Sequence, residues 1–183
     1  ADVYQRYLTW PEEWHGHLSQ RCKDLSLDYM CTVYLARDVR VVAPHVAGFK
    51  VSSFEAKDTE LHAEVLTRCS DGMRMILSLG MCSDEEIEAL LLYSNTDLLH
   101  CVSAYPTPFN AMNLSRINQK NLAGYSDHTS PELTMTGALA VAAGAYIIEA
   151  HMKLDTTDPS NPDAPHAMTP VQLSDYVQRL RMV

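Results

Sequence analysis

The sequence lacks several patterns that would indicate a common kind of binding site or location. It contains no GxGxxG or GxxxxGK[ST] stretch, so a nucleotide-binding loop is not expected. It also has no apolar run of about 18 residues and no basic-then-apolar leader, so we expect neither a membrane span nor a signal peptide. The five cysteines are an odd number without CxxC spacing, which favours reduced, mostly buried thiols in a cytoplasmic protein.

Positive charge is scarce as well. The 183 residues include 14 Lys and Arg against 23 Asp and Glu, which gives a formal net charge of −9. Binding to nucleic acid needs clustered basic residues, so no nucleic-acid partner is expected, and an anionic small molecule must be held by a local pocket. With 46% hydrophobic residues, the chain is apolar and long enough for one globular domain with a substantial core.

Short apolar segments rich in β-branched or aromatic residues recur along the chain, and helical segments lie between them. We expect strands at 27–35, 47–53, 75–79, 98–103, 122–126 and 145–154. Helix starts are indicated where a hydroxyl can cap the first turn, at Thr9-x-x-Glu12, Ser83-x-x-Glu86 and Thr169-Pro170-x-Gln172. The small apolar residues of 133–145 suit a helix packed closely on a sheet. The alternation predicts an α/β fold with a parallel sheet.

Two architectures fit this alternation, an open doubly wound sheet and a (β/α)8 barrel. Polar residues stand at the carboxyl ends of many of the expected strands: Thr32, Lys50, Ser53, Glu55, Ser78, Ser103, Ser126, His128 and His151. A barrel gathers groups from many strand ends at one mouth, whereas a dinucleotide-binding sheet concentrates its chemistry in one glycine-rich turn. The pattern therefore favours the barrel.

His128 and His151 follow neighbouring strands and are 23 residues apart. In a barrel the two rings can converge on one divalent cation, although a structural or exposed pair has the same spacing. Lys50 and the nearby strand-end hydroxyls can form a cup for a phosphate or carboxylate, and the alternative is a lysine that reaches solvent at the rim of the sheet. His100, within the apolar LLHC run, is expected to be a satisfied core histidine.

A family resemblance covers the chain from about Leu8 to its last residue. The stretches FKVSSFE, ILSLGMCSDEEIE, LLHCVSAYPTPFNAMNL, AGYSDHT and IIEAHMKLD resemble the N-acetylneuraminate synthase family, the sialic acid synthases with their legionaminate and pseudaminate relatives. The resemblance implies a (β/α)8 barrel that condenses phosphoenolpyruvate with an N-acylated aldohexose such as N-acetylmannosamine. The products are a nine-carbon 2-keto sugar acid and phosphate. It also implies a divalent Mn or Mg ion and a homodimer.

The resemblance also implies roles for particular residues. His128 and His151 look like the two metal ligands. Lys50 and Ser53 look like binders of phosphoenolpyruvate, joined by Thr32, Ser78 and Ser126. Glu55 is expected near the sugar or the attacking water, Tyr105 and Asp163 near the sugar hydroxyl and acetamido groups, and Ser103 in the pocket.

The chain also departs from the family pattern. Residues 1–183 are expected to form a single barrel domain that carries strands three to eight and lacks the first two βα units and a small C-terminal β-domain. The family's GPDH motif is NPDAPH here, with two residues inserted before His166. The alternative to an active enzyme is therefore a divergent or fragmentary non-catalytic relative that needs partner segments to complete the barrel.

Overall fold

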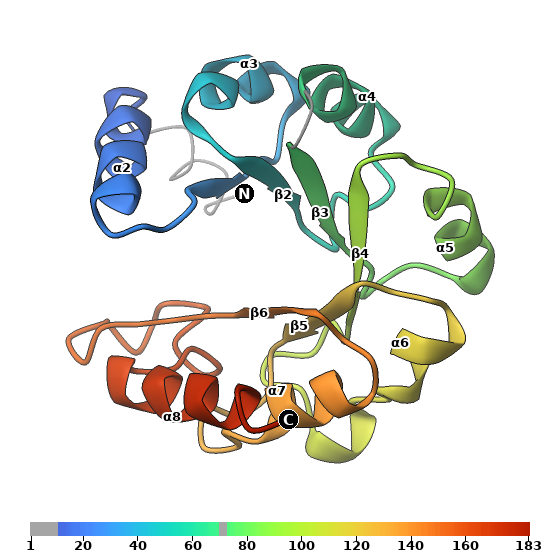
Figure 1. The fold of residues 1–183 in the computed structure, drawn as a ribbon, viewed down its shortest axis with the longest axis vertical. Helices are drawn as coiled ribbons and strands as arrows, with labels where there is room; N and C mark the ends of the chain where they lie inside the picture. Colours follow the sequence, from blue (N-terminus) through green and yellow to red (C-terminus); the bar gives the residue numbers. More distant parts are fainter. Residues whose placement is uncertain (1–10, 70–72) are drawn as a thin grey trace. The chain divides into compact units, whose positions relative to one another are not determined.

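The computed structural model describes residues 11–69 and 73–183. The chain forms two compact units, residues 1–76 and residues 77–183, and each is treated separately below. Helices and strands alternate throughout both units (Figure 1). The fold is therefore α/β, as the sequence predicts.

All six expected strands are present, and most are shorter than predicted. Their bounds are Met30–Thr32 (β1), Gly48–Val51 (β2), Arg74–Ser78 (β3), Thr96–Cys101 (β4), Gly124–Asp127 (β5) and Ile147–Ala150 (β6). Neighbouring strands follow chain order. β1 and β2 belong to the first unit and β4, β5 and β6 to the second, while β3 runs across the boundary between residues 76 and 77. β1 pairs with β2 in parallel, and β5 pairs in parallel with both β4 and β6.

Most helices lie between strands, while α2 precedes β1 and α8 follows β6. Their bounds are Glu13–Asp24 (α2), Val39–Val42 (α3), Thr59–Arg68 (α4), Asp84–Leu90 (α5), Ser115–Gln119 (α6), Thr136–Ala142 (α7) and Pro170–Leu180 (α8), with single 3-10 turns at Ala36–Asp38 (η1), Ala43–His45 (η2) and Phe109–Ala111 (η3). No helix in the described part of the chain is both long and apolar enough to cross a membrane.

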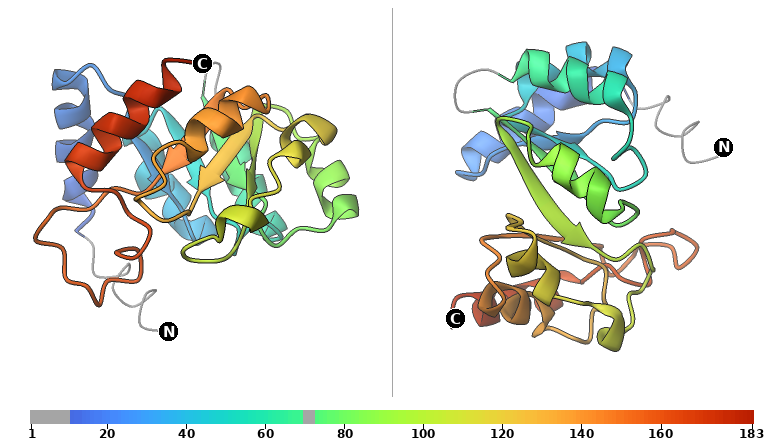
Figure 2. Two further views of the ribbon diagram at one scale, coloured as in Figure 1. Left: turned by 90° about the horizontal axis from the view of Figure 1, so that it is seen from below. Right: turned by 90° about the vertical axis from the view of Figure 1, so that its right-hand side faces the viewer.

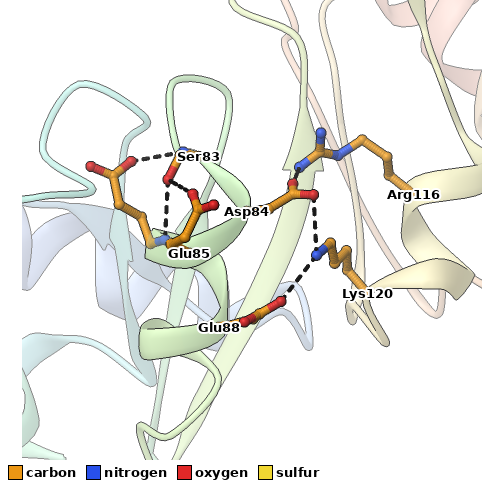
Figure 3. A network of polar contacts seen from close by, with 7 residues as sticks. Ser83, Asp84, Glu85, Glu88, Arg116 and Lys120 are labelled. Carbon is orange, nitrogen blue, oxygen red and sulfur yellow. Dashed lines mark hydrogen bonds and ion pairs between the residues drawn. The ribbon is translucent and has the colours of Figure 1, made fainter.

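Two of the helix starts predicted from the sequence are confirmed as capping boxes. The Ser83 hydroxyl accepts the Glu86 N–H, and the Glu86 carboxylate accepts the Ser83 N–H, at the start of α5 (Figure 3). Thr169 and Gln172 make the same reciprocal pair at the start of α8. Thr9, the cap expected for the first helix, lies outside the described residues. Each cap satisfies N–H groups that the first helical turn leaves without a helical partner.

An exposed ion-pair network joins α5 to α6 (Figure 3). Asp84 lies 2.7 Å from an Arg116 guanidinium nitrogen and 3.2 Å from Lys120 Nζ. Lys120 Nζ also lies 3.3 Å from a Glu88 carboxylate oxygen. The hydrogen bond from Lys120 contributes most to lowering the pKa of the Asp84 carboxyl. Because these groups are in solvent, the pairs orient the two helices more than they stabilise the fold.

Within the expected segment 133–145, only Thr136–Ala142 is helical, as α7, which contacts β5, β6 and α8 within the second unit (Figures 1 and 2). A Cβ added at Gly137 would come within 2.3 Å of the Tyr176 hydroxyl oxygen of α8. A Cβ added at Gly124 of β5 would come within 1.8 Å of the Ile147 carbonyl oxygen of β6. Glycine at these two positions allows the close approach, and the prediction of a closely packed helix is confirmed.

A buried apolar cluster lies beneath α6 and α7 in the second unit. Its members are Met112, Ile117, Tyr125, Ala140 and Ala145. Tyr125 belongs to β5, so the cluster fixes the strand whose carboxyl end carries His128. The packing of the core and the position of the polar strand ends are therefore linked.

Candidate active site

The ends of β4, β5 and β6 place polar side chains next to one another in the second unit. Cys101 is in register with Ser126, and Ser126 is in register with Glu149. His128 and His151 are the residues that directly follow β5 and β6. Carboxyl ends of parallel strands share one edge of a sheet, so the two imidazoles are neighbours, with ring centroids 5.2 Å apart. The proximity predicted from their spacing is confirmed.

A third histidine completes a cluster that the sequence did not predict. The His166 ring centroid lies 4.7 Å from that of His151 and 5.4 Å from that of His128. The Tyr105 ring closes the group, 4.7 Å from His128 and 5.3 Å from His166. Four aromatic rings from three separate segments therefore meet at the ends of β5 and β6. We call His128, His151 and His166 the histidine cluster.

His166 lies in the loop between β6 and α8. Met168 N–H donates to the His151 carbonyl at 2.8 Å, and Lys153 N–H donates to the Met168 carbonyl at 2.8 Å, so the returning chain pairs with the residues just after β6. His166 N–H donates to the Asp163 carbonyl at 3.1 Å in a tight turn. This turn places Asp163 Oδ1 3.8 Å from His166 Nε2.

Burial favours the neutral form of two rings of this cluster, His128 and His166. Burial lowers the pKa of His128 to about 4, with His151 and His166 acting in the same direction, while Glu149 opposes the shift. Burial, followed by the nearby His151, also lowers the pKa of His166. A neutral imidazole offers a nitrogen lone pair, which is the form that ligates a metal ion.

Several nitrogens of the cluster have no hydrogen-bond partner among the described residues. They are His151 Nδ1 and both ring nitrogens of His166. One ligand atom each from His151, Asp163 and His166 lies within 4.8 Å of the other two. Imidazole nitrogen with a carboxylate oxygen is a donor set that suits Mn, Fe or Zn. These residues therefore fit a divalent metal ion.

Glu149 lies between the strand ends and accepts hydrogen bonds from two hydroxyls. Ser126 and Ser78 both donate to its Oε2 atom, Ser78 at 3.3 Å. In this structure, both hydroxyls are directed at a carboxylate. The anion-binding role expected for Ser78 and Ser126 stays a prediction.

Asp127 anchors the end of β5 from the opposite side of the strand. Its buried carboxylate accepts hydrogen bonds from the Thr129 N–H at 2.9 Å, the Thr136 hydroxyl at 2.5 Å and the Tyr176 hydroxyl at 2.7 Å. Thr136 belongs to α7 and Tyr176 to α8. Two helices thereby fix the backbone that positions His128.

A profile of known protein families matches residues 1–183 as the NeuB family. The chain belongs to the NeuB family. It is 31% identical to the N,N'-diacetyllegionaminic acid synthase of Legionella pneumophila, over 93% of this chain and 51% of that protein. It is 31% identical to the pseudaminic acid synthase of Campylobacter jejuni, over 84% of this chain and 47% of that protein.

A solved structure resembles the fold of this NeuB-family chain. It is an N-acetylneuraminic acid synthetase from Leptospira borgpetersenii in complex with citrate, with a TM-score of 0.84 and 28% identity, covering 94% of this chain and 62% of that one. The chain spans about half the length of the curated relatives named above. The sequence resemblance to the sialic acid synthases and their relatives is confirmed.

Four of the expected NeuB-type site residues lie in the first unit. Thr32 of β1 is in register with Lys50 of β2, so these two stand side by side at the strand ends. Lys50 Nζ donates to the Val51 carbonyl at 2.9 Å. Ser53 is buried, and the buried Glu55 carboxylate accepts a hydrogen bond from the Ser52 hydroxyl. Their roles toward a substrate stay predictions.

The remaining expected residues lie in the second unit with the histidine cluster. Ser103 is half-buried, and Tyr105, whose peptide bond to Pro106 is cis, contacts the rings of His128 and His166. Asp163 lies beside His166. His100 Nε2 lies 2.8 Å from the Met112 carbonyl, so it is the satisfied core histidine that the sequence predicts.

Proposed function

We propose that this NeuB-family chain provides catalytic residues of an enzyme that condenses phosphoenolpyruvate with an N-acylated aldohexose. N-acetylmannosamine or a related sugar would give a nine-carbon 2-keto sugar acid and phosphate. The observation that carries the proposal is the histidine cluster at the ends of β5 and β6, the strand end where Glu149 also lies. The printed names of the relatives, synthases of legionaminic and pseudaminic acid, support the same chemistry.

The reaction forms one carbon–carbon bond and replaces the bond between C2 and the phosphate oxygen by a bond between C2 and the water oxygen, while the aldehyde oxygen gains a proton and the water loses its protons as the ketone forms. C3 of the enol attacks the sugar aldehyde carbon, water adds at C2, and the bond between C2 and the phosphate oxygen breaks to release phosphate. A bound Mn or Mg ion would polarise the aldehyde oxygen as a Lewis acid, and His128 and His151 are the residues that we expect to hold it.

The chain's own groups bind the substrates and move the protons. Lys50, Thr32 and Ser53 are assigned to the phosphate and carboxylate of phosphoenolpyruvate, because a lysine ammonium and hydroxyls complement anionic oxygens. Glu55 is assigned to orient the attacking water. Ser78 and Ser126 are assigned to the same anion, on the condition that their hydroxyls turn away from Glu149 when it binds.

Further residues are assigned to the sugar and the pocket. Tyr105 and Asp163 would bind its hydroxyl and acetamido groups, and Ser103 would line the pocket. The proposal also holds that the six strands belong to a (β/α)8 barrel. The protein would be located in the cytoplasm and would form a homodimer.

Phosphate release is the direct test. The protein is incubated with phosphoenolpyruvate, Mn²⁺ and a panel of N-acylated hexoses, and phosphate and keto acid are measured together. Equal amounts of both products, dependent on the sugar and lost in His128→Ala, support the proposal. No release with any N-acylated hexose would contradict it and favour the non-catalytic alternative.

A further inference from the structure

The loop that follows β6 carries two potential ligands to the histidine cluster. We propose that His151, Asp163 and His166 together bind one divalent transition-metal ion, so that this loop supplies a nitrogen and an oxygen ligand to the metal centre. The inference rests on the proposed function in one respect, because the ion it concerns is the metal of the proposed enzyme. Metal binding can be measured without catalysis, so the inference can be tested separately. The site keeps His151 of the pair expected from the resemblance, adds His166, and assigns Asp163 to the metal instead of to the sugar.

The distances between the three side chains suit one ion. Their ligand atoms all lie within 4.8 Å of one another. Metal–ligand distances of about 2.0–2.2 Å in a tetrahedral or more open sphere separate neighbouring ligand atoms by about 3–4 Å. A contraction of about 1 Å by side-chain rotation therefore closes the sphere, and the exposed Asp163 carboxylate is free to make most of that movement.

The burial of His166 supports a bound ligand. Its side chain is 2% exposed, and neither ring nitrogen has a hydrogen-bond partner among the described residues. His151 Nδ1 is also buried without a hydrogen-bond partner among the described residues. A buried polar group without a partner costs about 1–3 kcal/mol, so these three buried nitrogens are unfavourable unless a further group satisfies them. A metal ion satisfies one nitrogen of each ring.

The backbone holds the loop ligands in place before any ion binds. Ala167 N–H and His166 N–H both donate to the Asp163 carbonyl, at 2.9 and 3.1 Å. Lys153 Nζ donates to the Ala164 carbonyl at 2.5 Å, within the same turn. With Met168 paired to the residues after β6, the turn is fixed at both ends. Ligands on a fixed frame lose little conformational entropy when they bind.

The spacing of Asp163 and His166 along the chain accounts for this geometry. Asp163 and His166 stand at positions i and i+3 of the turn, and this spacing brings the carboxylate and the ring to the same side. Adjacent residues in an extended chain point to opposite sides. The turn therefore carries an Asp-x-x-His pair whose ligand atoms lie close to those of His151.

Titration with Co²⁺ tests the proposal on the full chain without substrates. The dissociation constant is taken from visible absorption and from competition with Zn²⁺ in calorimetry. We expect His166→Gln to weaken Co²⁺ binding by at least about tenfold and to change the absorption spectrum, because one nitrogen ligand is lost. Asp163→Asn should weaken binding several-fold. Asp155→Asn is the matched control, since Asp155 is an exposed aspartate of the same loop. The Co²⁺ affinity of this variant should equal that of the unchanged protein.

The possible results distinguish a failure of the loop ligands from a failure of the proposed function. Co²⁺ affinity and spectrum unchanged in both His166→Gln and Asp163→Asn would refute the loop ligands, whatever the catalytic result. If His166→Gln does not fold, Asp163→Asn decides, because its side chain is 60% exposed and its loss does not disturb the core. Loop-dependent metal binding without phosphate release would refute the proposed function and leave the metal site standing.

Discussion

Replacing Tyr176 by Phe removes one of the three hydrogen bonds to the buried Asp127 carboxylate. The Tyr176 side chain is 1% exposed, and its hydroxyl donates to Asp127 Oδ2 at 2.7 Å. Phe keeps the ring and its packing, so the change isolates the hydrogen bond. Thr129 and Thr136 remain as donors to the carboxylate.

The expected cost follows from the charge on the acceptor. A hydrogen bond to a charged group contributes about 1.5–3 kcal/mol to the free energy of unfolding. A loss of about 2 kcal/mol lowers the Tm of a chain of this length by about 4–8 °C. The free energy is measured by urea denaturation followed by circular dichroism, and the Tm by thermal unfolding.

Tyr125→Phe is the matched control. Tyr125 is fully buried as well, but its hydroxyl has no hydrogen-bond partner among the described residues. Removing an unpaired hydroxyl relieves a desolvation cost, so stability should be unchanged or raised by about 1 kcal/mol. Equal losses in both variants, or no loss in Tyr176→Phe, would refute the reasoning that the bond to Asp127 stabilises this strand end.

Three further changes have expected outcomes. Gly124→Ala should lower the free energy of unfolding by about 3 kcal/mol in urea denaturation, because the new Cβ overlaps the Ile147 carbonyl of the neighbouring strand. Burial lowers the pKa of His100, so its contribution to stability is complete above about pH 6.5 and falls as the unfolded chain takes up a proton at lower pH. His100→Gln, which can still donate to the Met112 carbonyl, should flatten this decline in Tm measured between pH 7 and pH 5, and an unchanged slope would assign the decline to other groups. Ser83→Ala should cost about 1 kcal/mol by removing the hydroxyl cap of α5, which urea denaturation resolves.

The features that the sequence predicts correctly are those set by short-range patterns. Apolar runs locate all six strands, and the Ser83 and Thr169 capping boxes locate two helix starts, because each signal depends on residues within one turn or one strand. The sequence correctly predicts that His128 and His151 lie close together, because they follow adjacent strands. The expected end of the last strand at residue 154 was wrong, because β6 ends at Ala150 and leaves His151 just beyond it.

The features that the sequence does not predict depend on contacts between distant residues. Ser78 and Glu149 are 71 residues apart, and Tyr176 and Asp127 are 49 apart. His166 reaches the cluster through the pairing of Met168 with Met152, which no periodicity encodes. The Asp163-x-x-His166 spacing was the one available signal, and it indicates a turn only once the anchoring of the loop is known.

The loop between β6 and α8 is anchored in one part and exposed in another, so a change of sequence has different consequences in the two parts. Its final turn, from Asp163 to Met168, is held against the residues after β6. Asn161 supports this turn as well, because its side chain accepts the Asp163 N–H at 2.9 Å and its carbonyl accepts the Ala164 N–H at 3.0 Å. The exposed stretch 158–160 makes no contact with the histidine cluster among the interactions described above. Residues can therefore be gained, lost or exchanged in that stretch while the imidazoles keep their positions, so variation at the rim of the site can proceed independently of its chemistry.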